Sequence, residues 1–376
     1  MNYYSTNGKA PIASLEKAVV KGLAEDRGLY MPEKIKQLPK EFFDTIETKT
    51  FQEIAYTVAN AFFSENVDAG SLKKIVYDTL AFDCPVVEVK ENIYSLELFH
   101  GPTLAFKDVG ARFMARLLQY FNREASINVL VATSGDTGSA VANGFLGVEG
   151  IHVYVLYPKG KVSPIQECQF TTLGQNITAI EVDGVFDDCQ ALVKSAFMDD
   201  ELNQHMKLTS ANSINVARFL PQAFYYFNAY ARLKEIVNRG SSDCQSVVMC
   251  VPSGNFGNIC AGLFGHEMGL PFKRFIAANN ANDIFYKYLQ TGKYEPKPSK
   301  QTLANAMDVG NPSNFARIYE LYGKSHERIT SLISGTTYSD EQIRETMRQC
   351  YADTGYILDP HGACGYQALV DGLKPG

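Results

Sequence analysis

Short apolar segments alternate with longer amphipathic ones along most of the chain. The apolar segments are rich in β-branched residues and bounded by turn residues, which predicts strands at 127–132, 151–156, 177–182, 246–251 and 273–278. The stretches between them have helical periodicity, and the one at 108–121 places four apolar residues on one face: Val109, Phe113, Leu117 and Phe121. Apolar strands separated by amphipathic helices are typical of parallel sheets covered on both faces. The pattern therefore predicts an α/β fold.

The first eighty or so residues have a different pattern. Gly28, Pro32 and Pro39 interrupt them, and an amphipathic stretch follows at 51–63. This part is predicted to be mostly helical. The polar stretch 290–300 is predicted to be a surface loop.

Composition narrows the function classes. The chain has 376 residues, 45% of them hydrophobic, and a net charge of -6, which gives no reason to expect nucleic-acid binding. It has no apolar run long enough to cross a bilayer, and its first residues do not resemble a secretory signal. The eight cysteines form no CxxC pair and the six histidines no HExxH motif, so we expect free thiols and no metal site. A cytoplasmic enzyme or binding protein is expected.

The turns from strand to helix are where ligands bind in such folds. In the turn 98–108, Lys107 follows Leu104, Ala105 and Phe106 and opens the predicted helix. An apolar setting at a helix start disfavours the charged form of a lysine, and an uncharged lysine is the nucleophile that forms Schiff bases. An ordinary solvated lysine is the alternative, and on spacing alone it stays open. Asp108 is explained as an acid that complements the helix dipole.

Two further turns are rich in glycine and hydrogen-bonding groups. The turn 133–139 offers the hydroxyls of Thr133, Ser134 and Thr137, which suit a carboxylate or phosphate, although ordinary helix capping explains them equally well. The turn 252–258, PSGNFGN, has the composition of a phosphate cradle, without matching GxGxxG or GxxxxGK[ST]. A Schiff-base lysine combined with a phosphate cradle indicates pyridoxal phosphate.

With these motifs in place, the sequence resembles the threonine synthases, enzymes of fold type II among pyridoxal phosphate enzymes, with a tryptophan-synthase-β-like fold. The resemblance runs almost end to end and is carried by segments at 18–32, 100–108 (HGPTLAFKD), 132–140 (ATSGDTGSA), 212–222 (NSINVARFLPQ), 252–258, 307–314 (MDVGNPSN) and 358–363 (LDPHGA). It implies three parts: a mostly helical segment at 1–85, a lobe at 86–215 with the Schiff-base lysine and the smaller of two parallel sheets, and a larger cofactor-phosphate lobe at 216–376.

The resemblance also implies residue roles. Lys107 would carry the cofactor and move protons at the substrate's α-carbon, and Asp136 would face the cofactor's 3′-oxygen. The cofactor phosphate would be held by one loop: Gly254, Asn255, Phe256, Gly257 and Asn258. The substrate's carboxylate or phosphate would meet Thr133, Ser134 and Thr137, and its phosphate would meet Asn212, Ser213 and Arg218. His100 and His361 are expected only to pack within loops.

The implied activity is conversion of O-phosphohomoserine and water to threonine and phosphate by β,γ-elimination and replacement, in a cytoplasmic monomer or homodimer without nucleic-acid or membrane partners. One alternative is another fold-type-II lyase, such as a serine or threonine dehydratase. A dehydratase would need no arginine to bind a phosphate on the side chain of its substrate. The other is a non-catalytic binding protein of the same fold, for which a retained Lys107 would have no use.

The last segment departs from the expected pattern. In this family a hydroxyl beyond the LDPHGA motif is set against the pyridine nitrogen, and the sequence stops at Leu373-Lys374-Pro375-Gly376. A Pro-Gly ending is unusual for an α/β domain. We therefore expect a C-terminally truncated chain with weakened cofactor affinity and an exposed apolar edge near 364–370.

Overall fold

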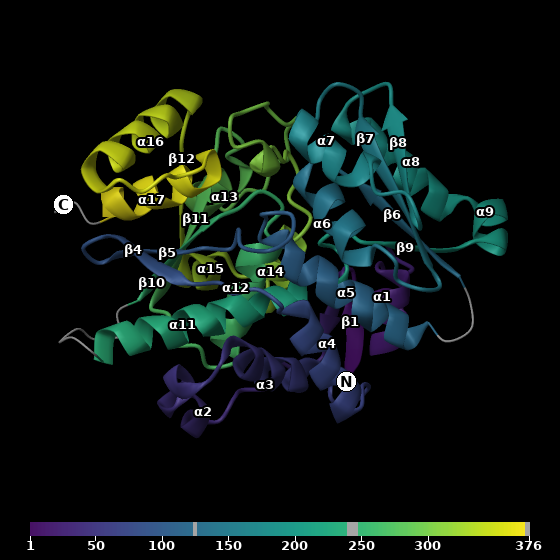
Figure 1. The fold of residues 1–376 in the computed structure, drawn as a ribbon, viewed down its shortest axis with the longest axis horizontal. Helices are drawn as coiled ribbons and strands as arrows, with labels where there is room; N and C mark the ends of the chain where they lie inside the picture. The colour runs from purple at the N-terminus through teal and green to yellow at the C-terminus, as the bar shows by residue number, and fades with distance from the viewer. Residues whose placement is uncertain (123–125, 239–246, 373–376) are drawn as a thin grey trace. The chain divides into compact units, whose positions relative to one another are not determined.

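The computed structural model describes residues 1–122, 126–238 and 247–372 (Figure 1). Contacts divide the chain into two compact units, one formed by 1–84 with 98–228 and the other by 85–97 with 229–376. This division differs from the expected one, because 85–97 belongs with the C-terminal half and 216–228 with the N-terminal half. The four residues Leu373 to Gly376, on which the expectation of a truncated end rests, lie outside the described residues.

The N-terminal part of the first unit combines a small sheet with helices. Strands β1 (Asn2–Ser5), β2 (Ala13–Ser14) and β3 (Tyr30–Pro32) form an antiparallel sheet in the order β2-β1-β3, which the sequence did not indicate. The helices are α1 (Leu15–Lys21), α2 (Lys40–Asp44), η1 (Ile46–Thr48), α3 (Phe51–Phe63) and α4 (Ala69–Thr79). Helix α3 coincides with the predicted helix and begins with a capping box between Thr50 and Glu53.

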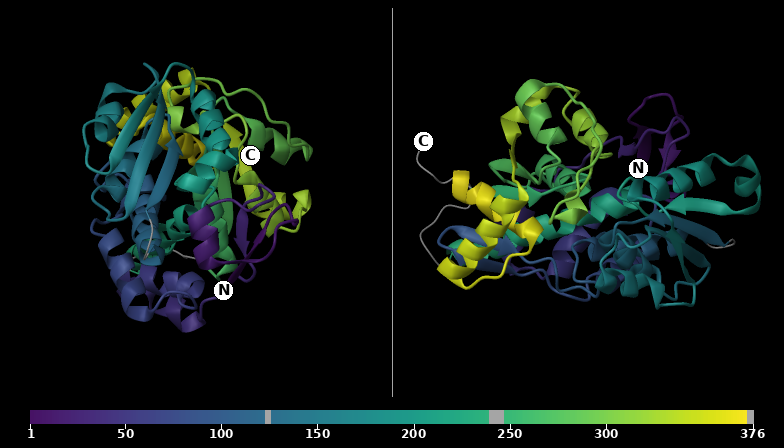
Figure 2. Two further views of the ribbon diagram at one scale, coloured as in Figure 1. Left: turned by 90° about the vertical axis from the view of Figure 1, so that its right-hand side faces the viewer. Right: turned by 90° about the horizontal axis from the view of Figure 1, so that it is seen from above.

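A four-stranded parallel sheet forms the rest of the first unit, in the order β8-β7-β6-β9 (Figure 2). Its strands are β6 (Ile127–Ala132), β7 (Ile151–Pro158), β8 (Ile177–Val182) and β9 (Lys207–Ser210). The helices are α5 (Lys107–Phe121), α6 (Asp136–Phe145), α7 (Pro164–Thr171), α8 (Phe186–Met198), α9 (Asp200–His205), α10 (Val216–Phe219) and η2 (Leu220–Gln222). Every residue of β6 is buried, and α6 and α8 both pack on it. The predicted α/β fold is confirmed.

The second unit also contains a parallel sheet, in the order β10-β11-β12. Its strands are β10 (Val248–Pro252), β11 (Arg274–Asn279) and β12 (Ile333–Thr337), beside the antiparallel hairpin β4 (Val86–Lys90) and β5 (Ile93–Leu96). Its helices are α12 (Gly257–Glu267), α13 (Ile284–Thr291), η4 (Asn305–Met307), α14 (Phe315–Leu321), α15 (His326–Leu332), α16 (Asp340–Thr354) and α17 (Pro360–Gly372). Helix α11 (Ala223–Asn238) crosses the division. Among the described residues this sheet is the smaller one, so the expected order of sheet sizes is wrong.

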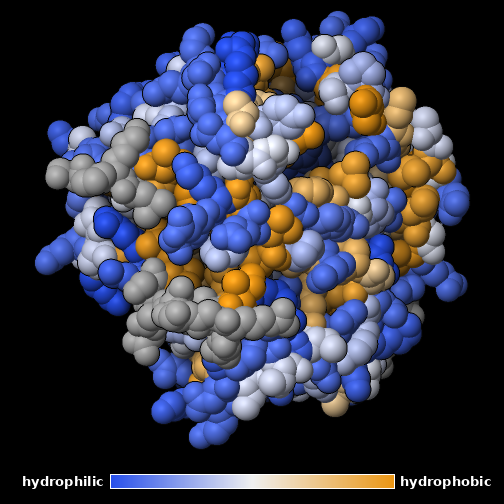
Figure 3. All heavy atoms as spheres, turned by 60° about the vertical axis from the view of Figure 1, so that its left-hand side comes forward, coloured by the Kyte–Doolittle hydropathy of each residue, from blue (hydrophilic) through white to orange (hydrophobic). Residues whose placement is uncertain are grey.

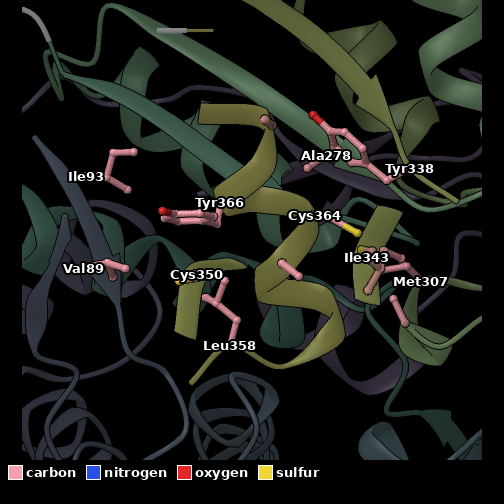
Figure 4. Packing of buried hydrophobic residues seen from close by; sticks show 13 residues of the cluster. Val89, Ile93, Ala278, Met307, Tyr338, Ile343, Cys350, Leu358, Cys364 and Tyr366 are labelled. Carbon is pink, nitrogen blue, oxygen red and sulfur yellow. The ribbon is translucent and has the colours of Figure 1, made fainter. Parts of the chain in front are cut away.

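Helix α17 lies in the core of the second unit. Its Cys364 and Tyr366 pack in a cluster with Val89 and Ile93 of the hairpin and with Cys350 of α16 (Figure 4). Residues 363–366 and 368 are buried, and Leu369 and Val370 are partly buried against the same cluster. The expected exposed apolar edge near 364–370 is therefore wrong, because α16 and the hairpin cover it.

Apolar side chains also reach the surface of this unit at Val248, Tyr351 and Ile357. Figure 3, turned toward the side that carries α16 and α17 in Figure 1, shows such apolar atoms in patches between hydrophilic ones. Throughout the described residues, each helix is either too short or too polar to span a membrane.

Candidate active site

Lys107 is the first residue of α5, as the sequence predicted. Its side chain is 15% exposed, and Nζ lies 3.0 Å from Oδ2 of Asp136. The ammonium also lies 5.1 Å from the centre of the Phe106 ring. The expected apolar setting is therefore only half correct, because a carboxylate from another turn faces the lysine. The two turns that the sequence singled out in this unit meet at this ion pair.

Asp136 is held from a second side. It is the first residue of α6, and the side-chain amide of Gln166 on α7 donates to its other oxygen, Oδ1. Gly135, just before it, has a φ of 142°, where a side chain would be strained, and an added Cβ would collide with Gln166. The carboxylate is thus fixed between Lys107 and Gln166. Nothing in the sequence marked Gln166, which lies 30 residues further along in the first turn of α7.

The hydroxyl residues of this turn differ in their surroundings. Thr133 is buried, and its Oγ1 accepts hydrogen bonds from the amides of Gly135 and Gly138 at 2.9 and 2.8 Å. Its oxygen therefore shapes the turn, and only its hydroxyl hydrogen is left for a ligand. Ser134 and Thr137 are half-buried. Their assignment to the substrate stays a prediction.

Asp108 does more than complement the helix dipole. It is 1% exposed, and its two oxygens accept hydrogen bonds from the amide and the hydroxyl of Thr103 at 2.9 and 2.6 Å. Gly101 passes so close that an added Cβ would lie 2.5 Å from Oδ2 of Asp108. The carboxyl group therefore ties the loop before Lys107 to the start of α5. Burial raises the pKa of Asp108, and the bonds from Thr103 oppose that shift only in part.

The raised pKa of Asp108 predicts a pH dependence of stability. A carboxyl group whose pKa is raised by folding destabilises the folded state once it ionises. This destabilisation is absent below the ordinary pKa of about 4 and grows as the pH rises through the raised pKa of the folded state. The Asp108→Asn variant carries a side-chain amide at this position, which does not titrate. We expect wild type to lose free energy of unfolding relative to this variant as the pH rises from about 4 towards neutrality. Urea unfolding of both proteins across this range measures the difference, and parallel pH profiles would contradict the prediction.

Arg218 is buried beside the lysine. It lies on α10, is 2% exposed, and donates from Nη1 to the main-chain oxygen of Lys107 at 3.1 Å. Within the described residues its Nε, also buried, has no hydrogen-bond partner. Burial lowers the pKa of Arg218 to about 10, so the guanidinium is still charged at neutral pH. A desolvated guanidinium with donors to spare is suited to bind an anion.

Close packing of two helices holds Arg218 in this place. Gly110 on α5 faces α10, and an added Cβ there would lie 2.4 Å from the carbonyl oxygen of Arg218. Only glycine therefore allows α10 to approach α5 this closely. Asn215 is fully buried and caps α10 by accepting the amide of Ala217 at 3.0 Å. Helix packing thus determines where the main chain of Arg218 lies.

The loop that contains Asn212 and Ser213 is tied to the same region. Nδ2 of Asn212 donates to the carbonyl of Ala132 at 3.3 Å, at the end of β6 where the turn 133–139 begins. Asn212 and Ser213 are both half-buried. Together with Lys107, Asp136 and Arg218, these contacts bring three of the singled-out sequence motifs into one region of the first unit.

The loop 254–258 follows β10 in the second unit and leads into α12. Its larger side chains point into the protein: Asn258 bonds to Ser253 and to the carbonyl of Pro252, and the buried ring of Phe256 packs 4.5 Å from that of Phe285. Helix α12 has no side-chain cap, and Phe256 before it has a φ of 63°. The loop thus engages its larger side chains within the protein and lies at the N-terminus of α12. A glycine-containing loop at a helix N-terminus is suited to bind a phosphate through main-chain amides.

Two residues that sequence reasoning left without a role support this loop. Asn314 donates from its main-chain amide and from Nδ2 to the carbonyl of Asn255, at 3.3 and 3.1 Å. Arg317 on α14 is fully buried and donates to Oδ1 of Asn314 at 2.7 Å. Burial lowers the pKa of Arg317 to about 9. The motif 307–314 could have suggested a role for Asn314, whereas Arg317 lies outside every motif.

The comparisons with known proteins agree over the whole chain. Residues 2–80 match the family model described as threonine synthase N terminus, and residues 74–376 match the one described as pyridoxal-phosphate dependent enzyme. A threonine synthase of Haemophilus influenzae is 45% identical over 100% of this chain and 86% of its own length.

Solved structures show the same likeness. The crystal structure of threonine synthase from Escherichia coli superposes with a TM-score of 0.93 at 42% identity, covering 100% of this chain and 86% of that one. The pyridoxal-phosphate-bound threonine synthase of Brucella melitensis gives 0.91 at 35% identity with the same coverage. These likenesses confirm fold type II and dependence on pyridoxal phosphate. The chain belongs to the threonine synthase family of pyridoxal-phosphate-dependent enzymes.

Proposed function

We propose that this enzyme converts O-phosphohomoserine and water into threonine and phosphate. The observation that carries the choice of substrate is Arg218, a buried guanidinium that donates to the main chain of the proposed catalytic lysine and whose Nε has no partner among the described residues. A substrate that carries a phosphate on its side chain gives this guanidinium a function. We further propose that the enzyme works in the cytoplasm as a monomer or homodimer.

The roles of the cofactor contacts follow from chemistry at each position. Lys107 would hold the aldehyde of pyridoxal phosphate, Asp136 would face its 3′-oxygen, and the cofactor phosphate would be bound by a single loop: Gly254, Asn255, Phe256, Gly257 and Asn258. When bound, the cofactor supplies an electron sink for charge that develops at the substrate's α-carbon. The side chains of Asn255, Phe256 and Asn258 contact neighbouring groups of the protein, and main-chain amides of the loop would donate to the phosphate.

Lys107 would also move protons at the substrate's α-carbon. Its Nζ is within hydrogen-bond reach of Asp136, which Gln166 holds in place, so the amine is oriented before any ligand arrives. An ionised Asp136 beside an ionised 3′-oxygen would be repulsive, so one of the two groups should hold a proton. The low exposure of both side chains, 15% and 22%, limits access of water to this amine.

Substrate anions would be divided between two groups of residues. Arg218, Asn212 and Ser213 would take the phosphate, because a guanidinium can donate two parallel hydrogen bonds to it. Ser134 and Thr137, half-buried at the start of α6, would take the carboxylate with the hydroxyl of Thr133. The burial of Arg218 makes this contact strong, since few water molecules compete for it.

The test is release of inorganic phosphate from O-phosphohomoserine, with threonine identified as the product by chromatography. Serine and threonine serve as control substrates in the same assay. Formation of pyruvate or 2-oxobutanoate from them, without phosphate release from O-phosphohomoserine, would favour the dehydratase alternative. Failure to turn over any of the three would favour a binding protein.

Gly254 supplies a prediction for the phosphate loop. An added Cβ there would lie 2.6 Å from Cα of Met307 and 3.0 Å from the carbonyl oxygen of Ala306, both main-chain atoms that cannot rotate away. Gly254→Ala must therefore displace the loop, and we expect it to weaken pyridoxal phosphate binding roughly 10-fold, about the loss of one good hydrogen bond. Titration of the apoprotein with the cofactor measures this. Gly70→Ala is the control, because its Cβ would meet only Oδ1 of Asp68 at 3.5 Å; equal affinities in both variants would refute the prediction.

A further inference from the structure

The LDPHGA motif at the start of α17 contains a histidine with a defined hydrogen-bond role. Nδ1 of His361 lies 2.6 Å from Oδ2 of Asp359, and Nε2 of His361 accepts a hydrogen bond from the main-chain amide of Ala306 at 3.1 Å. The side chain of His361 is 26% exposed. The ring therefore joins the start of α17 to the segment Asn305–Met307, which lies 55 residues earlier in the chain.

These two contacts determine the tautomer of His361. A ring nitrogen that accepts an amide hydrogen carries no proton, so the proton of the neutral ring is on Nδ1 and is donated to Asp359. Asp359 also accepts the amides of His361 and Gly362, at 3.2 and 2.8 Å. Although burial works in the opposite direction, these bonds hold the pKa of Asp359 below its ordinary range. A charged Asp359 thus keeps Nε2 available as an acceptor.

The segment Asn305–Met307, which His361 contacts through Ala306, lies directly against Gly254 of the proposed phosphate loop. Its Ala306 and Met307 are the residues whose main-chain atoms an added Cβ on Gly254 would strike. Asp308, the residue after the segment, accepts hydrogen bonds from the amide and the hydroxyl of Thr302 at 2.9 and 2.7 Å and from Asn280 at 2.8 Å. His361 and Asp308 therefore both hold this stretch of main chain, and the stretch limits where Gly254 can lie.

We propose that His361 is a positioning residue for the cofactor phosphate, acting through the amide of Ala306 on the main chain that packs against Gly254. This inference rests on the proposed role of the loop 254–258. His361 does not touch the phosphate in this scheme. Its acceptor nitrogen keeps the segment Asn305–Met307 in register, so that the loop is already in its binding conformation before the cofactor arrives.

Two substitutions test the roles of the two ring nitrogens, Nδ1 and Nε2, separately. In His361→Asn the side-chain amide can still donate to Asp359 from the position of Nδ1, but nothing accepts the amide of Ala306. In His361→Gln the side-chain oxygen reaches the position of Nε2 and can still accept it. We expect H361N to bind pyridoxal phosphate about 10-fold more weakly than wild type, and H361Q to stay within about 3-fold of it. Fluorescence titration of the apoproteins measures both affinities.

Pyridoxal, which lacks the phosphate, makes the test specific. If His361 acts on the phosphate loop, H361N should bind pyridoxal as wild type does, and the preference for pyridoxal phosphate over pyridoxal should fall about 10-fold. Wild-type affinity of H361N for pyridoxal phosphate would overturn the inference. Equal losses for both compounds, or equal losses in H361N and H361Q, would also overturn it, because either result indicates general destabilisation.

Failure of the underlying assignment gives a different result. If wild-type protein binds pyridoxal as tightly as pyridoxal phosphate, the loop is not the phosphate site, and both the cofactor assignment and this inference fail. Should H361N not fold, as judged by its thermal transition, Asp359→Ala replaces it. That variant removes the group that keeps the proton on Nδ1, and it is expected to lower the same preference by a smaller factor; an unchanged preference would overturn the inference.

Discussion

Replacing Lys107 with alanine is expected to reduce the formation of threonine by at least about 10³-fold, the scale seen when a covalent catalytic residue is removed. The variant loses the amine that carries the cofactor and moves protons at the substrate, and no other group can do both. The fold should survive, because Asp136 keeps its hydrogen bond from Gln166 when Nζ is gone. Purified wild type should be yellow and the variant colourless.

A matched control for this prediction is Lys40→Ala. Lys40 is also the first residue of a helix, α2, but it is exposed. We expect this variant to keep its colour and its activity. Treatment of wild type with borohydride should attach the cofactor irreversibly to the peptide that contains Lys107, and attachment to any other lysine would refute the assignment.

Replacing Arg218 with methionine is expected to lower kcat/KM for O-phosphohomoserine roughly 10- to 100-fold, the range for a lost hydrogen bond to a charged group. Methionine is a long unbranched side chain without a charge, so the loss measures the contribution of the guanidinium, whose Nε has no partner in the part of the chain that the structure describes. The absorption spectrum of the bound cofactor should stay nearly unchanged. Inhibition by inorganic phosphate should weaken in parallel, since the same site would bind it.

Arg112→Met separates this effect from a loss of stability. Arg112 is on α5, the helix against which α10 packs, and its guanidinium donates to the carbonyls of Thr79 and Asp78 at 3.0 and 2.8 Å. We expect this control to unfold at a lower temperature and to keep its kcat/KM. If the Arg218 variant instead lost its cofactor and kept its affinity for substrate, Arg218 would bind the cofactor phosphate, and its assignment to the substrate phosphate would be wrong.

The strands that could be predicted from sequence are those whose signal is local. Strands β6 and β8 match the predicted ranges to the residue, because a run of β-branched and apolar residues between turns needs no partner to be recognised. Strand β9 reads Lys-Leu-Thr-Ser and β12 reads Ile-Ser-Gly-Thr-Thr, and neither was predicted. These polar segments are strands because β6 and β11 beside them supply hydrogen-bond partners, which is a property of the tertiary structure.

The α/β class, the turns that carry chemistry and, through the motifs, the family could be predicted from the order of residues along the chain. This was possible because helical and strand periodicity and the glycine content of turns are properties of neighbouring residues. Which side chains support those turns depends on the tertiary structure: Gln166 on Asp136, Asn314 on Asn255, and His361 on Ala306. Of these contacts, the first joins residues 30 positions apart and the last 55. A hydrogen bond requires its partners within about 3 Å, and over such separations only the packing of helices and sheets determines which groups come that close.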